Sequence, residues 1–441
     1  MSYLDNILFF IILSIGIGYF TINVKKIIRN IKLGKEINRF DNPSERWKNM
    51  AMIALGQSKM VKRPVSGILH IFVYVGFVII NIEVLEIMID GLFGTHRIFS
   101  FLGGLYDVLI GSFEILALLV LVAVIVFLIR RNGIKLKRFI HSDLKGWPKS
   151  DANYILYFEV ALMSLFLLMN AADYHLQLLN VGEYHRVGSF PVSQLIEPIF
   201  NGMSESLVML FERGAWWLHI CGILIFLNYL YFSKHLHILL AFPNTYFANL
   251  NPQGQFDNLE SVTNEVKLMM DPNADPFAAP APDADAVPGK FGASDVQDLN
   301  WVQLLNAYTC TECGRCTSSC PANQTGKKLS PRKIMMDTRD RLEEVGRNID
   351  LNKGAFVDDG KALLNDYITP EELWACTSCN ACVEECPVNI SPLSIIMDMR
   401  RYLVMEQSAA PMSLNAMMTN IENNSAPWQY SQQDRLNWKN E

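Results

Sequence analysis

The sequence predicts an all-α protein, with a five-helix transmembrane bundle followed by an α-helical, cysteine-rich domain outside the membrane. Three observations support this fold class. Long apolar stretches occur before about residue 242 and not after it, in a chain that is 50% hydrophobic and 19% charged. Two cysteine runs in the second half each lead into a helical pattern of apolar residues, and no convincing strand pattern is present there. The net charge of −6 gives no indication of nucleic-acid binding.

Five stretches in residues 1–242 are long enough to cross a bilayer, which takes about 20 mostly apolar residues. The first is not a typical signal peptide, because basic residues follow it and none precede it. The spans are expected over Ile7–Val24, Pro64–Ile89, Leu105–Ile129, Tyr154–Leu179 and Ala215–Phe242.

The distribution of basic residues predicts the orientation of these spans. The loops after spans one and three are dense in Lys and Arg, whereas the other two loops contain only Arg97, Arg186 and Arg213. Basic loops stay on the cytoplasmic side. We therefore expect a multi-pass protein of a bacterial or archaeal cytoplasmic (inner) membrane, with its N-terminus outside and its cysteine-rich domain in the cytoplasm.

Eight of the nine cysteines form two copies of the run C-x2-C-x2-C-x3-C-P. This run holds cubane iron–sulfur clusters in two-cluster ferredoxins, where the fourth cysteine ligates the other cluster. The sequence therefore predicts two [4Fe-4S] clusters. Cluster 1 is assigned to Cys310, Cys313, Cys316 and Cys386, and cluster 2 to Cys376, Cys379, Cys382 and Cys320.

Structural zinc is the alternative for these cysteines. Zinc takes four ligands, usually as two separated pairs, and not a run of four followed by proline that occurs twice. Disulfides are disfavoured because cluster cysteines need a reducing compartment, which agrees with the predicted orientation.

The second half is expected to contain a linker (residues 243–290), a two-cluster domain (291–408) and a tail (409–441). The segment Asp271–Gly289 is rich in Pro, Ala and Asp and reads as a semi-extended acidic linker. Each cysteine run is followed by a matching helical segment. Ser330 and Ser391 are suitable N-caps for these helices, each with a proline at the first helical position.

Histidines in the expected spans predict haem b, which needs an axial ligand from each side. On one continuous fifth helix, His219 and His237 are five whole turns apart and share a face, about 27 Å apart along the axis. Counting from the membrane ends pairs His70 with His237 around an inner haem. The same counting pairs His175 with His219 around a second, outer haem. His235 points about 160° away from His219 and is the weaker candidate.

Acidic residues inside the spans predict a polar pocket near the outer surface. Charged residues are costly in hydrocarbon and indicate function by default. Glu83, Glu86 and Asp173 lie in the outer third, with Glu114 slightly deeper. We expect a site there where a quinol is oxidised and its protons are released, or a quinone is reduced. The alternative is that these carboxylates pair among themselves or face loop water.

The spans, the histidines and the cysteine runs resemble those of known families. Five spans with histidines on the second and fifth resemble the cytochrome b subunit (gamma) of respiratory nitrate reductase. The segment Ala307–Pro331 looks like the helical ferredoxin that forms the C subunit of heterodisulfide reductase. The same unit occurs in membrane iron–sulfur oxidoreductases of the glycolate oxidase and electron-transfer-flavoprotein:menaquinone type. The tail segment Asn424–Trp438 resembles the arm that these proteins use to hold a partner.

The sequence departs from these patterns in two places. The nitrate reductase subunit has two histidines on span two, whereas this chain has only His70, so an outer haem would take its ligand from His175. Larger relatives carry Cys-Cys-Gly (CCG) modules, but this chain has no Cys-Cys-Gly and no cysteine after Cys386. The resemblance therefore implies a separate CCG-type iron–sulfur subunit and a flavoprotein as partners.

Together these features predict an oxidoreductase subunit that conducts electrons between the quinone pool, with menaquinone expected, and a cytoplasmic partner. No dinucleotide fingerprint, P-loop or nucleophile constellation is present, so the chain has no complete active site for an organic substrate. Two alternatives remain: a membrane redox sensor, and a haem-free anchor for a ferredoxin module.

Overall fold

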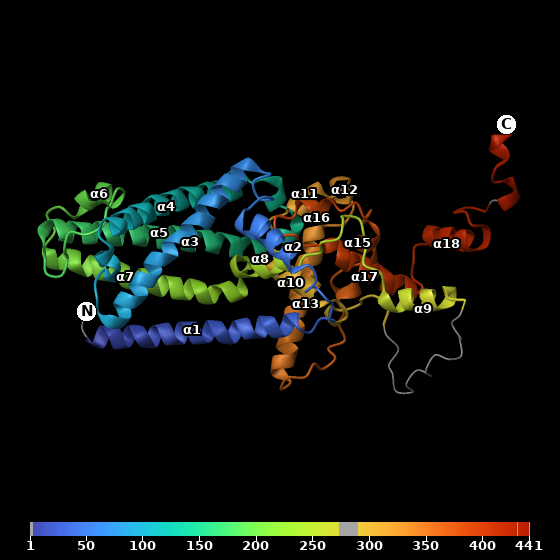
Figure 1. Ribbon diagram of the computed structural model, residues 1–441, viewed down its shortest axis with the longest axis horizontal. Coiled ribbons are helices and arrows are strands. Elements are labelled where there is room, and N and C mark those ends of the chain that lie inside the picture. Colours follow the sequence, from blue (N-terminus) through green and yellow to red (C-terminus); the bar gives the residue numbers. More distant parts are fainter. Residues whose placement is uncertain (1–2, 273–289, 430, 441) are drawn as a thin grey trace.

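The structure, a computed structural model, describes residues 3–272, 290–429 and 431–440. The described residues form helices and turns and no strand, which confirms the predicted all-α class. Figure 1 shows an elongated molecule with long helices at one end and shorter helices at the other. The N-terminus lies at the end of the long helices that is far from the short ones.

Five helices are long and apolar enough to cross a membrane, which indicates a membrane protein. They are α1 (Tyr3–Ile31), α3 (Pro64–Phe93), α4 (Gly104–Leu128), α5 (Trp147–Leu179) and α7 (Glu205–Tyr229). Many of their apolar side chains are exposed on the outside of the bundle, as expected for a surface that faces lipid. The number of predicted spans is therefore confirmed.

The fifth span ends earlier than the sequence predicted. Helix α7 stops at Tyr229, and two short turns, Leu230–Phe232 and Lys234–Leu236, lead into α8 (His237–Tyr246). Between these turns Ser233 has an extended backbone (φ −119°, ψ 147°). A single helix over Ala215–Phe242 was therefore wrong, and so was the argument that five helical turns separate His219 from His237.

Contacts of Lys234 explain this break. Its backbone N–H donates to Asp151 of α5 at 3.2 Å, and its buried ammonium pairs with Glu312 of the cysteine-rich half. A buried charge is stable only with a partner. The chain leaves the helix at the point where Lys234 can reach both carboxylates, which no local pattern reveals.

The cysteine-rich half is a compact group of helices, and its core continues into the bundle through Ile27, Leu230 and Leu236. It contains α10 (Trp301–Thr309), α11 (Arg315–Ser319), α12 (Pro321–Gln324), α13 (Pro331–Leu351), α14 (Leu363–Asp366), α15 (Pro370–Trp374), α16 (Ala381–Glu385) and α17 (Pro392–Met405). The predicted repeat is present, because α11 and α13 correspond to α16 and α17. Ser330 accepts from the Lys333 N–H and Ser391 from the Ser394 N–H, so both predicted N-caps are confirmed.

The cysteine-rich half packs against one end of the helical bundle. Helix α1 runs past its predicted span, and there Arg29 donates to the Gly346 carbonyl at 2.9 Å. Asn30 donates to the Tyr308 hydroxyl at 2.9 Å. Gly346 permits this approach, because a Cβ there would lie 2.4 Å from the Asn30 amide nitrogen. This is the end that carries the basic loops after spans one and three, so those loops and the cysteines share one side of the bundle.

The expected linker is partly helical. The end of α8 and all of α9 (Glu260–Met270) fall within residues 243–290. Most of the acidic segment, residues 273–289, lies outside the described residues. In the tail, α18 (Met412–Asn424) is followed by the short turns Gln432–Asp434 and Asn437–Lys439, which lead away from the cysteine-rich half to the C-terminus in Figure 1.

Candidate functional site: two cysteine cavities beside a histidine pair

The eight cysteines of the two runs line two small neighbouring cavities. Site one is lined by Cys310, Cys313, Cys316 and Cys386, and site two by Cys320, Cys376, Cys379 and Cys382. Cys382 also borders site one. Each site thus takes three cysteines from one run and the last cysteine of the other. This is the exchange that the sequence predicted.

Left-handed backbone positions shape the two cysteine loops in the same way. Glu312 and Gly314 have φ values of 54° and 73°, and the equivalent Ser378 and Asn380 have 56° and 59°. Glycine is needed in the first loop, because a Cβ at Gly314 would lie 2.5 Å from a guanidinium nitrogen of Arg332. Asn380 serves in the second loop because asparagine tolerates this conformation.

The thiols are mostly buried, and burial makes them suitable as cluster ligands only when a cation is bound. Burial raises the pKa of Cys310 and Cys382 to about 12 and that of Cys386 to about 11. A buried thiolate needs a neighbouring positive charge, which iron provides. Across residues 3–272, 290–429 and 431–440, no three His, Cys, Asp or Glu side chains are close enough to hold a single metal ion. Each cavity brings together four of the thiols that the sequence assigned to one cluster, which is the number of cysteine ligands that a [4Fe-4S] cluster takes.

Site one lies against the helical bundle and is surrounded by basic side chains. Arg315, which lines it, is buried and donates to the carbonyls of Lys59 and Met60, both at 3.2 Å. Arg332, also buried, pairs with Asp143 of the loop between α4 and α5. Lys59 and Arg315 both act electrostatically on Cys386. Site one is therefore a positively charged environment formed by both halves of the molecule.

Site two is less basic and closer to the surface. Its lining includes Leu329, Leu393 and Ile396. Cys379 is exposed, in contrast to the buried Cys310 of site one. Arg400 of α17 acts electrostatically on Cys376. Site two is therefore accessible from the surface of the molecule through Cys379.

His70 and His237 lie in the same region, at the end of the bundle next to site one, and are near enough to interact electrostatically. His70 on α3 interacts electrostatically with His237 at the start of α8 and with Arg315 of site one. The Nδ1 atom of His70 is buried without a hydrogen-bond partner. Nδ1 of His237 lies 3.1 Å from the Lys234 carbonyl, which leaves Nε2 available. Metal-binding histidines typically donate their other N–H to such a carbonyl.

His235 is nearer to this pair than the sequence suggested. Its ring centroid lies 5.5 Å from that of His237, because both residues follow the break after α7. Its Nε2 atom lies 3.8 Å from a carboxylate oxygen of Glu159. The prediction that His235 points away from His219 assumed a continuous helix, and the break after α7 removes that basis.

His175 and His219 do not face one another. The His219 ring packs on Phe166 of α5, with 5.9 Å between ring centroids. His175 is nine residues further along α5, a rise of about 13 Å, and its Nδ1 lies 2.6 Å from Glu197. The two helices are antiparallel, and counting from their predicted ends misjudged their relative depth. The predicted outer pair was therefore wrong, although His219 is buried with an unpartnered Nδ1.

The acidic residues of the outer third do converge, around an arginine that the sequence places in a loop. Arg97 is buried and pairs with Asp173 at 2.5 Å and with Glu83 at 3.9 Å. Glu86 accepts hydrogen bonds from the Tyr106 hydroxyl and the Phe99 N–H. The loop after α3 folds back into the bundle, so Arg97 occupies much of the predicted pocket and leaves a cavity of about 30 Å³.

Glu114 lies apart from this network. One of its carboxylate oxygens accepts from the N–H groups of Val192 and Ser193, at 2.9 and 3.1 Å. Its position on α4 therefore serves to hold the loop that precedes α7.

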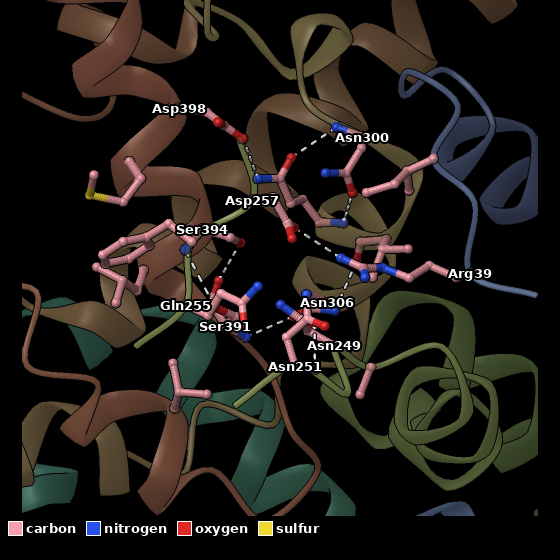
Figure 2. Close-up of a pocket in the computed structure, with 18 of the residues that line it drawn as sticks. Arg39, Asn249, Asn251, Gln255, Asp257, Asn300, Asn306, Ser391, Ser394 and Asp398 are labelled. Atoms are coloured by element: carbon pink, nitrogen blue, oxygen red, sulfur yellow. Dashed lines mark hydrogen bonds and ion pairs between the residues drawn. The ribbon is translucent and has the colours of Figure 1, made fainter. Parts of the chain in front are cut away.

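A cavity of about 620 Å³ lies where the loop after α1 and the segment after α8 meet the cysteine-rich half (Figure 2). Its polar side chains mostly pair with each other. Arg39 contacts Asp257 at 3.1 Å, and Asn306 accepts from the Ser391 N–H at 2.8 Å. None of the predicted cysteine, histidine or carboxylate site residues lines it, so we interpret it as a polar join between segments.

Comparison with known families identifies the cysteine region. Residues 309–390 match the 4Fe-4S dicluster domain family. We refer to this segment by the family that it matches, as the dicluster domain. The match covers both cysteine runs and supports the predicted iron–sulfur clusters.

Curated relatives extend the similarity to nearly the whole chain. The chain is 30% identical to the probable iron-sulfur-binding oxidoreductase FadF of Bacillus subtilis, over 99% of this chain and 61% of that protein. It is 26% identical to the EtfAB:quinone oxidoreductase of Syntrophomonas wolfei, over 98% of this chain and 59% of that protein. The chain thus spans about 60% of the length of these relatives.

The dicluster domain also has shorter relatives. It is 33% identical to the C subunit of the ferredoxin/F(420)H(2)-dependent CoB-CoM heterodisulfide reductase of Methanosarcina acetivorans, over 24% of this chain and 52% of that protein. No solved structure gives a significant match to the chain. These relatives are named oxidoreductases or oxidoreductase subunits, which supports the prediction of an electron-transfer oxidoreductase subunit.

Proposed function

We propose that this chain is the electron-transfer subunit of a membrane oxidoreductase. It passes electrons between the quinone pool, with menaquinone as the expected quinone, and a soluble iron–sulfur or flavoprotein partner. The observation that carries the proposal is the position of the two four-cysteine sites. They lie one behind the other, and site one packs on the end of the bundle that holds His70 and His237.

Two [4Fe-4S] clusters would be held by the cysteines of sites one and two. Each cluster would supply one-electron transfer. The chain's own residues set the environment, because Arg315 and Lys59 place positive charge at site one while site two is mainly apolar. Cys382 borders both cavities, so the two clusters would be neighbours.

Haem b fits the pair formed by His70 and His237. Burial lowers the pKa of His237, so its imidazole is neutral, which is the form that binds iron. The Lys234 carbonyl orients the ring. Haem bound here would exchange single electrons with cluster 1 and with quinone. His219 would serve a second haem only with a partner other than His175.

The iron–sulfur side of the bundle is proposed to face the cytoplasm. The basic loops after α1 and α4 are on this side, and basic loops remain in the cytoplasm. Lys62 and Arg63 of the first loop pair with Glu384 and Glu385 of the dicluster domain, at 2.5 and 2.9 Å. The residues that predict the orientation thus also bind the two halves together.

Glu83, Glu86 and Asp173 are proposed to handle protons for quinone chemistry at the opposite end. Arg97 fixes Asp173 and leaves one oxygen of Glu83 buried without a partner. The cavity beside them has room for water and not for a quinone ring. The quinone would therefore approach from the lipid side, and the carboxylates would relay its protons.

The proposed partners are a CCG-type iron–sulfur subunit and a flavoprotein. One relative is named an EtfAB:quinone oxidoreductase, and this chain spans 59% of it. Cys379 of site two is exposed, and the tail after α17 projects away from the bundle (Figure 1), so both are accessible to a soluble partner.

The test is visible and electron paramagnetic resonance (EPR) spectroscopy of the purified full chain. We expect a b-type spectrum together with two cluster signals. His70→Ala should remove the inner haem band and leave the cluster signals, whereas His185→Ala, in an exposed loop, should change neither. A haem band that survives His70→Ala would contradict the ligand assignment. A preparation without haem would indicate an anchor, and one whose haem does not respond to quinol would indicate a sensor.

A further inference from the structure

We propose that a basic groove at the membrane surface binds the phosphate of an anionic phospholipid. The groove has a volume of about 510 Å³ and lies between the start of α3 and the segment after α4. Its basic lining residues are Lys62, Arg63, Arg130, Lys137 and Arg138. This inference depends on the bundle spanning a membrane and not on the proposed electron transfer.

The position of the groove matches the depth of lipid phosphates. Pro64 is the first residue of α3, and α4 ends at Leu128 just before Arg130. Apolar spans end where the hydrocarbon ends, and phospholipid phosphates lie directly beyond that point. The groove is thus at the membrane–water boundary, on the side of the dicluster domain.

The charge of the groove is one-sided. Five of its lining residues are Lys or Arg and none is Asp or Glu. Lys62 and Arg63 have carboxylate partners on α16. In the described part of the chain, Arg130 and Lys137 have no ion pair or side-chain hydrogen bond. The Nε atom of Arg138 is buried without a partner. Uncompensated cations of this kind call for an anion.

The arginines around the groove repel one another. Arg138, which interacts electrostatically with Cys313 of site one, is among them. Burial lowers the pKa of Arg138, and Arg63, Arg315 and Arg130 lower it further, while Cys313 opposes this. A phosphate between Arg130 and Arg138 would offset the repulsion. It would therefore steady the segment that contacts site one.

The surface below the groove suits acyl chains. Val65 and Ile68 of α3 and Ile125 and Ile129 near the end of α4 are exposed apolar residues, between 42% and 57% accessible. A free phosphate ion would not use these residues. The combination of cations above and apolar residues below therefore favours a lipid, and basic pockets between transmembrane helices on the cytoplasmic side bind such head groups.

Native mass spectrometry of the full chain in detergent tests this inference. The probes are phosphatidylglycerol and the zwitterionic phosphatidylcholine, each added at equal concentration. We expect phosphatidylglycerol to bind about tenfold or more tightly than phosphatidylcholine. The double variant Arg130→Gln, Lys137→Gln should lose this preference. The control Lys145→Gln, Lys149→Gln removes the same charge from two exposed residues outside the groove, one in the α4–α5 connection and one in the first turn of α5, and should retain the preference.

Three results would overturn the proposal. One is equal binding of the two lipids by the unmodified chain. Another is an equal loss of preference in the control variant, which would indicate a diffuse charge effect. The third is displacement of phosphatidylglycerol by millimolar inorganic phosphate, which would make the groove an ion site. Circular dichroism of both variants verifies that they are folded.

Discussion

Site one and site two are built on the same repeated backbone but lie in different electrostatic surroundings. The left-handed positions Glu312 and Gly314 recur as Ser378 and Asn380, and Arg315 of the first repeat corresponds to Ala381 of the second. Arg332, at the second position of α13, corresponds to Leu393 of α17. The repeat thus preserves the geometry of the cages, while these two arginines are found only at the cage that touches the bundle.

This difference indicates what each site does. Arg315 and Arg332 both bind segments next to the bundle. Arg315 binds the carbonyls of Lys59 and Met60 just before α3, and Arg332 binds Asp143 of the α4–α5 connection.

At site two the equivalent positions are apolar, and Cys379 is exposed. The first copy of the repeat therefore docks to the bundle through buried arginines, whereas the second does so through the surface carboxylates Glu384 and Glu385 and leaves Cys379 exposed. The following predictions test this comparison.

Removal of a single cysteine should empty the site to which the structure assigns it, and not the site of its own run. Cys386→Ala should abolish cluster 1 although Cys386 belongs to the second run, because Cys386 lines site one. The purified variant should keep roughly half of its iron and show the EPR signal of cluster 2. The matched variant Cys379→Ala should instead lose cluster 2. Loss of cluster 2 in Cys386→Ala would disprove the exchange of ligands.

The ion pair between Arg332 and Asp143 should stabilise site one. Site two has Leu393 at the position equivalent to Arg332, so Arg332→Leu copies site two. Arg332→Leu leaves a buried carboxylate without its partner, which costs about 3 kcal/mol of unfolding free energy. Chemical denaturation in detergent, followed by the loss of cluster absorbance, measures this. Adding Asp143→Leu to the same chain should recover part of the loss. If the double variant is no more stable than the single one, the pair is not the cause.

The charge of Arg315 should raise the reduction potential of cluster 1 relative to cluster 2. Its guanidinium acts on Cys313 and Cys386, and positive charge favours the added electron. Arg315→Ala, which copies Ala381, should remove about 2 kcal/mol of stabilisation of the reduced cluster, which lowers the reduction potential of cluster 1 by on the order of 100 mV. Potentiometric EPR titration measures both clusters at once, so cluster 2 is an internal control. An equal shift in both clusters would indicate a general change in structure.

A surface ion pair beside site two should matter little. Lys328 and Glu371 pair with side chains that are 65% and 63% exposed, and such pairs contribute below about 1 kcal/mol. Lys328→Ala should leave the unfolding midpoint and both potentials nearly unchanged. A loss as large as that of Arg332→Leu would remove the contrast between the two sites.

The sequence was most informative where the relevant contacts are local or repeated. The cysteine runs, the N-caps Ser330 and Ser391, and the apolar spans each follow from spacing alone. The break after α7 did not, because Lys234 leaves the helix for Asp151 and Glu312, which are distant in the chain. Arg97 was likewise missed, because a basic residue in a short loop gives no signal that the loop folds back among buried carboxylates.

The central claim is that electrons pass between the clusters and quinone through the His70 and His237 pair. The most direct measurement uses the full chain in liposomes that contain a long-tailed menaquinone. The clusters are reduced with dithionite, the dithionite is removed, and cluster reoxidation is followed by EPR. We expect reoxidation in the unmodified chain and a block in His70→Ala, with both cluster signals intact. Reoxidation at the same rate in His70→Ala would contradict the account.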